Sequence, residues 1–199
     1  MELVSAIPSS SAGSAGWLKG RVIGALICGF FGAIWMFEAV YLGGMARPVW
    51  LPLIWIATLG FIIWPVVRLR SFSPQPRSSA EGERWASVSK TYWGIVAIEW
   101  GLCAGAANWL GHTHRYQLIP VFLGAIIGIH FLPLAKLFRV PIYYVTGFVM
   151  TFGVLATVLI PNPHVRNIAA YSVNGLTLWA TAAVILWQDW SQRNESESH

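Results

Sequence analysis

Six apolar segments constrain this chain more than any other feature of its sequence. An α-helix of about 20 residues rises about 30 Å, which matches the hydrocarbon thickness of a membrane. The segments run from Val22 to Met45, from Pro48 to Val67, from Thr91 to Leu110, from Gln117 to Ala135, from Pro141 to Ile160 and from Asn167 to Trp187. They predict an all-α polytopic membrane protein, folded as a six-transmembrane-helix bundle.

The composition excludes the main alternatives to a membrane protein. Apolar residues make up 56% of the chain and charged residues only 11%. A soluble domain carries about 25% charged residues, and disorder requires low hydrophobicity with high charge. The net charge of +5 does not indicate a nucleic-acid partner, because the basic residues stand beside apolar segments, where lipid headgroups and topology account for them.

The polar segments define the domain organisation. Residues 1–21 are expected to be a flexible cytoplasmic N-terminus, residues 22–190 the transmembrane domain, and residues 191–199 a cytoplasmic tail. Within the transmembrane domain, residues 68–90 form the one long loop, and its second half is expected to be a short interfacial helix anchored by Trp85. The N-terminus lacks the order of regions that a signal peptide requires, so we expect no cleavage.

Charge asymmetry gives the expected orientation. With six spans, ten of the 13 Lys and Arg residues fall on the side of the termini and of loop 68–90. Cytoplasmic loops are enriched in Lys and Arg, so both termini are predicted to be cytoplasmic. Tryptophans near the predicted span ends, such as Trp50, Trp64 and Trp187, fit an interfacial aromatic belt.

An ionisable pair is predicted inside the cytoplasmic half of the bundle. Counting the helical rise places Glu99 about 12 Å and His130 about 10 Å from the cytoplasmic ends of their antiparallel spans. Tyr144, on the fifth span, is expected close to the same level. Ionisable groups in a membrane interior are costly and mark solute or proton pathways. The alternative is a buried structural pair, or a neutral Glu99 bonded to a backbone carbonyl.

A second polar level is predicted nearer the outer surface. Glu38 and Asn108 approach the outer ends of the first and third spans, and Asn174 lies on a polar stripe of the sixth span with a seven-residue period. A polar stripe on a spanning helix faces protein or water, not lipid. The stripe therefore predicts either a shallow outer cavity or interhelical hydrogen bonds, which are equally compatible with the pattern.

No metal or cofactor site is predicted. Cys28 and Cys103 lie within apolar segments and are expected to be small buried hydrophobes. His112 and His114 supply two ligands, whereas a zinc site needs three or four. The catalytic motifs HExxH, GxSxG, Walker A and CxxC are absent from the sequence, which weighs against an enzyme.

Glycines spaced four residues apart predict close helix packing. Gly20 and Gly24 have this spacing, as do Gly101 and Gly105, and Gly124 and Gly128. This spacing lets helix backbones approach each other in lipid. We expect contacts within one bundle, and a homo-oligomer is the alternative.

Two sequence segments resemble those of a bacterial group. The run GIHFLPL, residues 128–134, and the run YYVTG, residues 143–147, resemble segments of small uncharacterised bacterial integral membrane proteins. The resemblance covers the fourth and fifth spans and implies location in the bacterial inner membrane, without implying an activity. The tryptophan content is similar to that of the bacterial tryptophan-rich sensory proteins, in composition alone.

Three classes of function remain open at this point. The first is binding or transport of a small solute or an ion through a polar bundle interior, around Glu99 and His130. The second is a structural or sensory subunit that acts through a partner, with loop 68–90 as its docking surface. The third is an enzyme acting on a lipid, with the same pair as acid and base, and it predicts a lipid-sized cavity that opens laterally beside His130.

Overall fold

The computed structural model describes residues 11–44, 50–70 and 79–197, and over these residues the chain is helical with short turns. The long helices are α1 (Ser11–Leu42), α2 (Trp50–Arg70), α3 (Ser79–His112), α4 (Ile119–Phe138), α5 (Ile142–Ala156) and α6 (Pro163–Glu197). Single 3₁₀ turns, η1 (Tyr116–Leu118) and η2 (Thr157–Leu159), precede α4 and follow α5. The all-α prediction is confirmed.

Five of these helices are long and apolar enough to cross a membrane, namely α1, α2, α4, α5 with η2, and α6. The chain is therefore a multi-pass membrane protein. The remaining long helix, α3, falls short of the other five in hydropathy because Glu99 and Asn108 interrupt its apolar half. Five of the six predicted spans are therefore supported.

Three helices extend beyond the predicted spans. α1 begins at Ser11, so residues 11–21, expected to be flexible, are helical, and residues 1–10 lie outside the described residues. α3 is continuous from Ser79, so the expected separate interfacial helix is instead the first part of α3. α6 reaches Glu197 and includes most of the expected tail. The cause is common to all three, because hydropathy marks the membrane-embedded part of a helix and not its full length.

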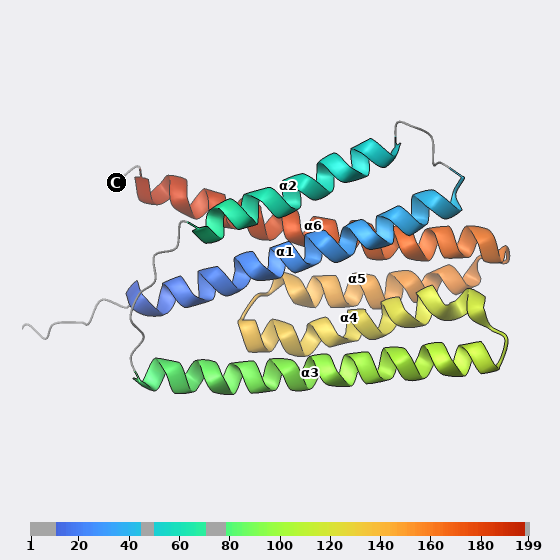
Figure 1. The fold of residues 1–199 in the computed structure, drawn as a ribbon, viewed down its shortest axis with the longest axis horizontal. Helices are drawn as coiled ribbons and strands as arrows, with labels where there is room; N and C mark the ends of the chain where they lie inside the picture. The colour runs from blue at the N-terminus through green and yellow to red at the C-terminus, as the bar shows by residue number, and fades with distance from the viewer. Residues whose placement is uncertain (1–10, 45–49, 71–78, 198–199) are drawn as a thin grey trace, which may run out of the picture.

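The helices pack in the order α2, α1, α6, α5, α4, α3 (Figure 1). Each contacts its neighbours in this row, and α4 also contacts α6 and α1. The first and last long helices of the chain therefore lie side by side at the centre. α2 and α3 occupy the two edges, so each leaves much of its surface free for lipid.

Glycines permit the close contacts within the row. Trp179 of α6 lies against Gly32 of α1, and its Nε1 donates a hydrogen bond to the carbonyl oxygen of Gly29 at 3.1 Å. On α4, Gly124 meets Asn174 of α6 and Gly128 meets Thr151 of α5. These positions accept no side chain without displacing a neighbour.

The predicted glycine pairs therefore divide into two kinds. Gly24 lies against the Tyr143 hydroxyl, and Gly124 and Gly128 lie against α6 and α5, so these glycines pack inside the bundle as expected. A methyl group on Gly101 or Gly105 would meet nothing within 4 Å. That pair faces away from the bundle, on the outer side of the edge helix α3.

Polar contacts join three helices at one end of the bundle. Arg68 of α2 forms an ion pair with Asp189 of α6, with 2.8 Å between Nε and Oδ2. Arg21 of α1 donates a hydrogen bond to the side-chain oxygen of Gln188. These contacts connect the edge helix α2 and the central helix α1 to α6.

Candidate functional site

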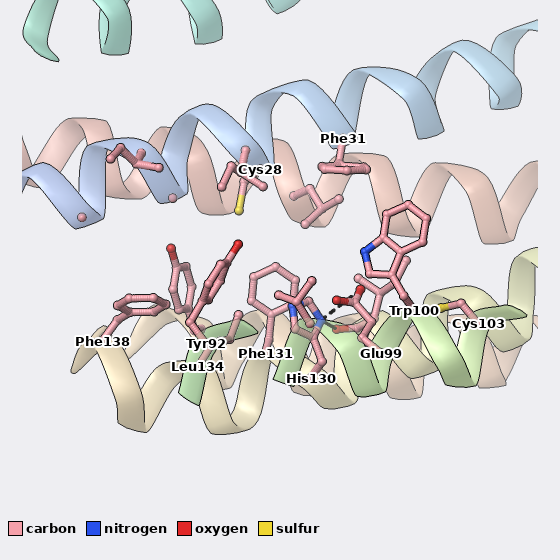
Figure 2. Close-up of a pocket in the computed structure, with 18 of the residues that line it drawn as sticks. Cys28, Phe31, Tyr92, Glu99, Trp100, Cys103, His130, Phe131, Leu134 and Phe138 are labelled. Atoms are coloured by element: carbon pink, nitrogen blue, oxygen red, sulfur yellow. Dashed lines mark hydrogen bonds and ion pairs between the residues drawn. The ribbon is translucent and has the colours of Figure 1, made fainter. Parts of the chain in front are cut away.

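Glu99 of α3 and His130 of α4 form the predicted pair. The Glu99 Oε1 atom lies 3.5 Å from the His130 Nδ1 atom, and each side chain is only 15% exposed (Figure 2). The predicted contact between the two groups is therefore present. It forms because α3 and α4 are antiparallel neighbours joined by a short turn, so residues at similar depth come side by side.

A backbone hydrogen bond orients the histidine ring. His130 Nδ1 lies 2.7 Å from the carbonyl oxygen of Ile127, one turn earlier in α4. A carbonyl oxygen only accepts, so Nδ1 carries a proton and donates it. In the uncharged ring, Nε2 is then an acceptor. The ring thus presents its Nδ1–H to both Ile127 and Glu99, and keeps its second nitrogen for another group.

The pair balances its charge with one proton. If the proton is on Glu99, both side chains are neutral, and if it is on His130, the pair is a carboxylate and an imidazolium. Both arrangements have zero net charge, as a group surrounded by hydrocarbon requires. Any charged ligand that binds here must change this balance.

The pair lines a cavity of about 500 Å³ between α1, α3 and α4. A cavity of this size can hold a drug-sized molecule. α1 contributes Cys28 and Phe31 from one side, and α4 contributes Phe131 and Phe138 from the other (Figure 2). Most of the remaining lining residues are apolar, so this is an apolar cavity with one ionisable pair.

The α3 wall of the cavity follows a seven-residue period. Trp85, Tyr92 and Glu99 are seven residues apart, and Cys103 follows one turn after Glu99. Seven residues are two helical turns, so these side chains share one face of α3. Trp85 and Tyr92 cover the part of the α3 wall that is nearest the end of the bundle where Arg21 lies.

The cavity opens sideways between α1 and α3. Ile27 and Phe31 of α1 and Trp100 of α3 line the cavity, and all three are also exposed at the protein surface, Trp100 by 67%. The opening is therefore bordered by exposed apolar side chains of both helices.

Tyr143, and not Tyr144, is the tyrosine that α5 contributes to this site. Tyr144 is 43% exposed and does not line the cavity. Tyr143 is buried, lines the cavity, and brings its hydroxyl against Gly24 of α1. Consecutive helical residues point about 100° apart, so the predicted depth was compatible with either residue and only the rotation of α5 decides between them.

The predicted outer polar residues lie apart from this site. Asn108 is exposed on α3, and Glu38 is half-buried on α1. Asn174 of α6 is fully buried against Gly124 of α4. Neither its side-chain nitrogen nor its side-chain oxygen has a hydrogen-bond partner among the described residues. None of the three lines the cavity around Glu99, so the structure contains two separate polar regions rather than one pathway.

Several lining residues were not predicted as site residues. Cys28 and Cys103 were expected to be ordinary buried residues, and Cys28 is indeed buried, but both line the cavity. Tyr92 and Trp100 were not singled out. The seven-residue spacing of Trp85, Tyr92 and Glu99 was a signal that could have identified the face of α3.

Comparison of the chain with protein-family models, with curated proteins and with solved structures finds no significant match. Among the residues that the structure describes, no three His, Cys, Asp or Glu side chains are grouped so as to hold a metal ion. The chemistry of the site is therefore derived from its own side chains.

Proposed function

We propose that this protein binds a small, largely apolar solute in the cavity between α1, α3 and α4, as the recognition step of transport in a membrane. One observation supports this most directly: the Glu99–His130 pair lines a cavity of about 500 Å³ that is open toward lipid. Small-molecule sites are mostly apolar cavities with a few polar groups that fix the orientation of the ligand. Transport of a free ion is supported less, because the outer polar residues do not continue the cavity.

The proposal includes six spans and a bacterial inner-membrane location, with both termini in the cytoplasm. α3 has 34 residues, lies beside α4 over much of its length, and exposes Trp93, Ile98 and Leu102 in its apolar half. Such a surface is suited to lipid. A sixth span also puts ten of the 13 basic residues on the cytoplasmic side, as the bias of cytoplasmic loops favours.

Filling the cavity tests the binding function. Val96 lines the cavity, and a Val96→Trp substitution is expected to place an indole ring in it and so obstruct the space beside Glu99. Ile98→Trp on the same helix is the matched control, because Ile98 is 66% exposed and lies outside the cavity. Native mass spectrometry of the purified protein should show a small molecule bound to the wild type and to Ile98→Trp, with at least a severalfold loss in Val96→Trp. Equal occupancy in all three proteins would refute binding in this cavity.

A second candidate function is catalysis on a lipid-soluble molecule. The cavity opens to lipid beside His130, as a lipid-active enzyme requires, and the pair could act as acid and base. The same mass measurement separates the two functions. A bound molecule that is released unchanged after prolonged incubation supports a carrier, whereas conversion to a new mass that requires Glu99 supports an enzyme.

A further inference from the structure

The cavity combines an ionisable pair with an unusually aromatic wall. Eight of its 21 lining residues are Phe, Trp or Tyr. Trp100 follows Glu99 on α3, Phe31 of α1 lies across the cavity from them, and Phe131 is next to His130, with 4.8 Å between the two ring centroids (Figure 2). The faces of aromatic rings carry negative charge density and attract organic cations.

The charges of the lining residues favour a cation over an anion. Glu99 can carry a full negative charge, and none of the described lining residues is Lys or Arg. The Nδ1–H of His130 is already directed at Ile127 and Glu99. An anionic amphiphile such as a fatty acid would therefore meet the Glu99 carboxyl group and find no Lys or Arg among the described lining residues.

We propose that the solute is a lipophilic organic cation, held between the Glu99 carboxylate and the aromatic wall, and that it binds in exchange for one proton. This rests on the proposed function and names its substrate class. The Glu99–His130 pair with one proton has zero net charge. When the cation binds, the pair loses that proton, so the loaded cavity again has zero net charge.

The proton balance involves one pair of groups. The titratable groups that line the cavity near Glu99 are His130 of α4, Tyr92 and Cys103 of α3, Cys28 of α1 and Tyr143 of α5. Phenols and thiols are uncharged near neutral pH. Arg21 of α1 is bonded to Gln188 at the end of the bundle and keeps its charge. The released proton therefore comes from the Glu99–His130 pair.

The first measurement is binding of radiolabelled tetraphenylphosphonium to the purified full-length protein, with neutral triphenylphosphine oxide as competitor. The wild type should bind the cation saturably, and Glu99→Gln should weaken binding by roughly tenfold or more, since an interaction with a full charge is lost. Glu83→Gln, an exposed position of α3 outside the cavity, is the matched control and should bind as the wild type does.

The second measurement is proton release by the wild type, which does not depend on the folding of any variant. In weakly buffered solution, saturation with tetraphenylphosphonium should release about one proton per cation bound, and triphenylphosphine oxide should release none. A purely structural Glu99–His130 pair would release none in either case.

The outcomes separate this proposal from the proposed function. Equal cation affinity in the wild type and Glu99→Gln, or binding without proton release, would overturn the cation proposal. If the wild type does not bind tetraphenylphosphonium while Val96→Trp still loses its co-purified molecule, the cavity binds a neutral solute and only the substrate class is wrong. If the wild type does not bind tetraphenylphosphonium and Val96→Trp also keeps its co-purified molecule, the proposed function is refuted as well.

Discussion

The ion pair between Arg68 and Asp189 joins an edge helix to the centre of the bundle. Its Nε–Oδ2 distance is 2.8 Å, and the Asp189 side chain is 5% exposed. Removing one partner of a buried pair leaves the other charge unpaired, which destabilises a protein by about 3 to 5 kcal/mol. Arg68→Met should therefore lower the unfolding temperature strongly, as measured by tryptophan fluorescence in detergent.

The double variant Arg68→Met with Asp189→Leu provides the control for this prediction. Both charges are absent, so most of the lost stability should return. If Arg68→Met alone unfolds at the wild-type temperature, the pair contributes nothing to stability and α2 is held by its contact with α1.

For single residues, the sequence was sufficient to predict the height of a residue along its helix, but not the direction in which its side chain points. Glu99 and His130 were placed at similar heights from the helical rise alone, and they are in contact. Tyr144 was chosen over Tyr143 at nearly the same height, and it faces away from the cavity. The rotation of a helix about its axis depends on which neighbours it packs against, and apolar residues on all sides of α5 leave that rotation undetermined in the sequence.

At the scale of elements, glycines with the same spacing should respond differently to substitution. A methyl group at Gly128 of α4 would meet the backbone nitrogen of Thr151 at 2.7 Å, so α4 and α5 would have to move apart. Overpacking of this kind costs about 1 to 3 kcal/mol. Gly128→Ala should therefore reduce the free energy of unfolding, measured as the midpoint of thermal or denaturant unfolding.

Gly105→Ala is the matched substitution at an open position. Nothing lies within 4 Å of the added methyl group, and alanine is favoured over glycine in a helix by up to about 1 kcal/mol. This variant should be as stable as the wild type or slightly more stable. A large loss at Gly105 would show that this face of α3 is covered, for example by a second copy of the chain.

The extents of the helices were the least predictable feature of the elements. α3 was expected to begin at Thr91, after a separate interfacial helix, and it is one helix from Ser79 to His112. Its sequence contains no proline that would end a helix, so the helix continues past the apolar segment. Hydropathy reports the surrounding solvent and carries little information about where a helix ends in water.

At the scale of the whole molecule, α3 determines the topology. If α3 crosses the membrane and both termini are cytoplasmic, residue 113 lies outside while residues 83 and 192 lie in the cytoplasm. Single cysteines at Thr113, Glu83 or Gln192, all exposed, can be placed in a chain with Cys28→Ala and Cys103→Ala. A membrane-impermeant maleimide applied to intact bacterial cells should label residue 113 alone. Labelling of residue 192 alone, or of residues 83 and 113 together, would instead indicate five spans, because residues 83 and 113 lie on the same side when α3 does not cross.

The arrangement of the helices was only partly predictable. Short turns between α3 and α4 and between α4 and α5 imply that these helices are neighbours, and they are. The large contact between α1 and α6 was not indicated, because no short connection joins them. It depends on matching surfaces, with Gly32 against Trp179 and Gly175 against Met36, and a single sequence does not reveal which surfaces match.

The contact between α1 and α6 has a consequence for synthesis of the chain. About 120 residues separate the end of α1 at Leu42 from the start of α6 at Pro163. Ribosomes add about 5 to 20 residues per second, so α6 is made roughly 6 to 25 s after α1. Throughout that interval the face of α1 that carries Gly32 lacks its partner on α6, although Phe61 of α2 can already pack against Gly29. The contact between α1 and α6 therefore forms only after the intervening helices have been made.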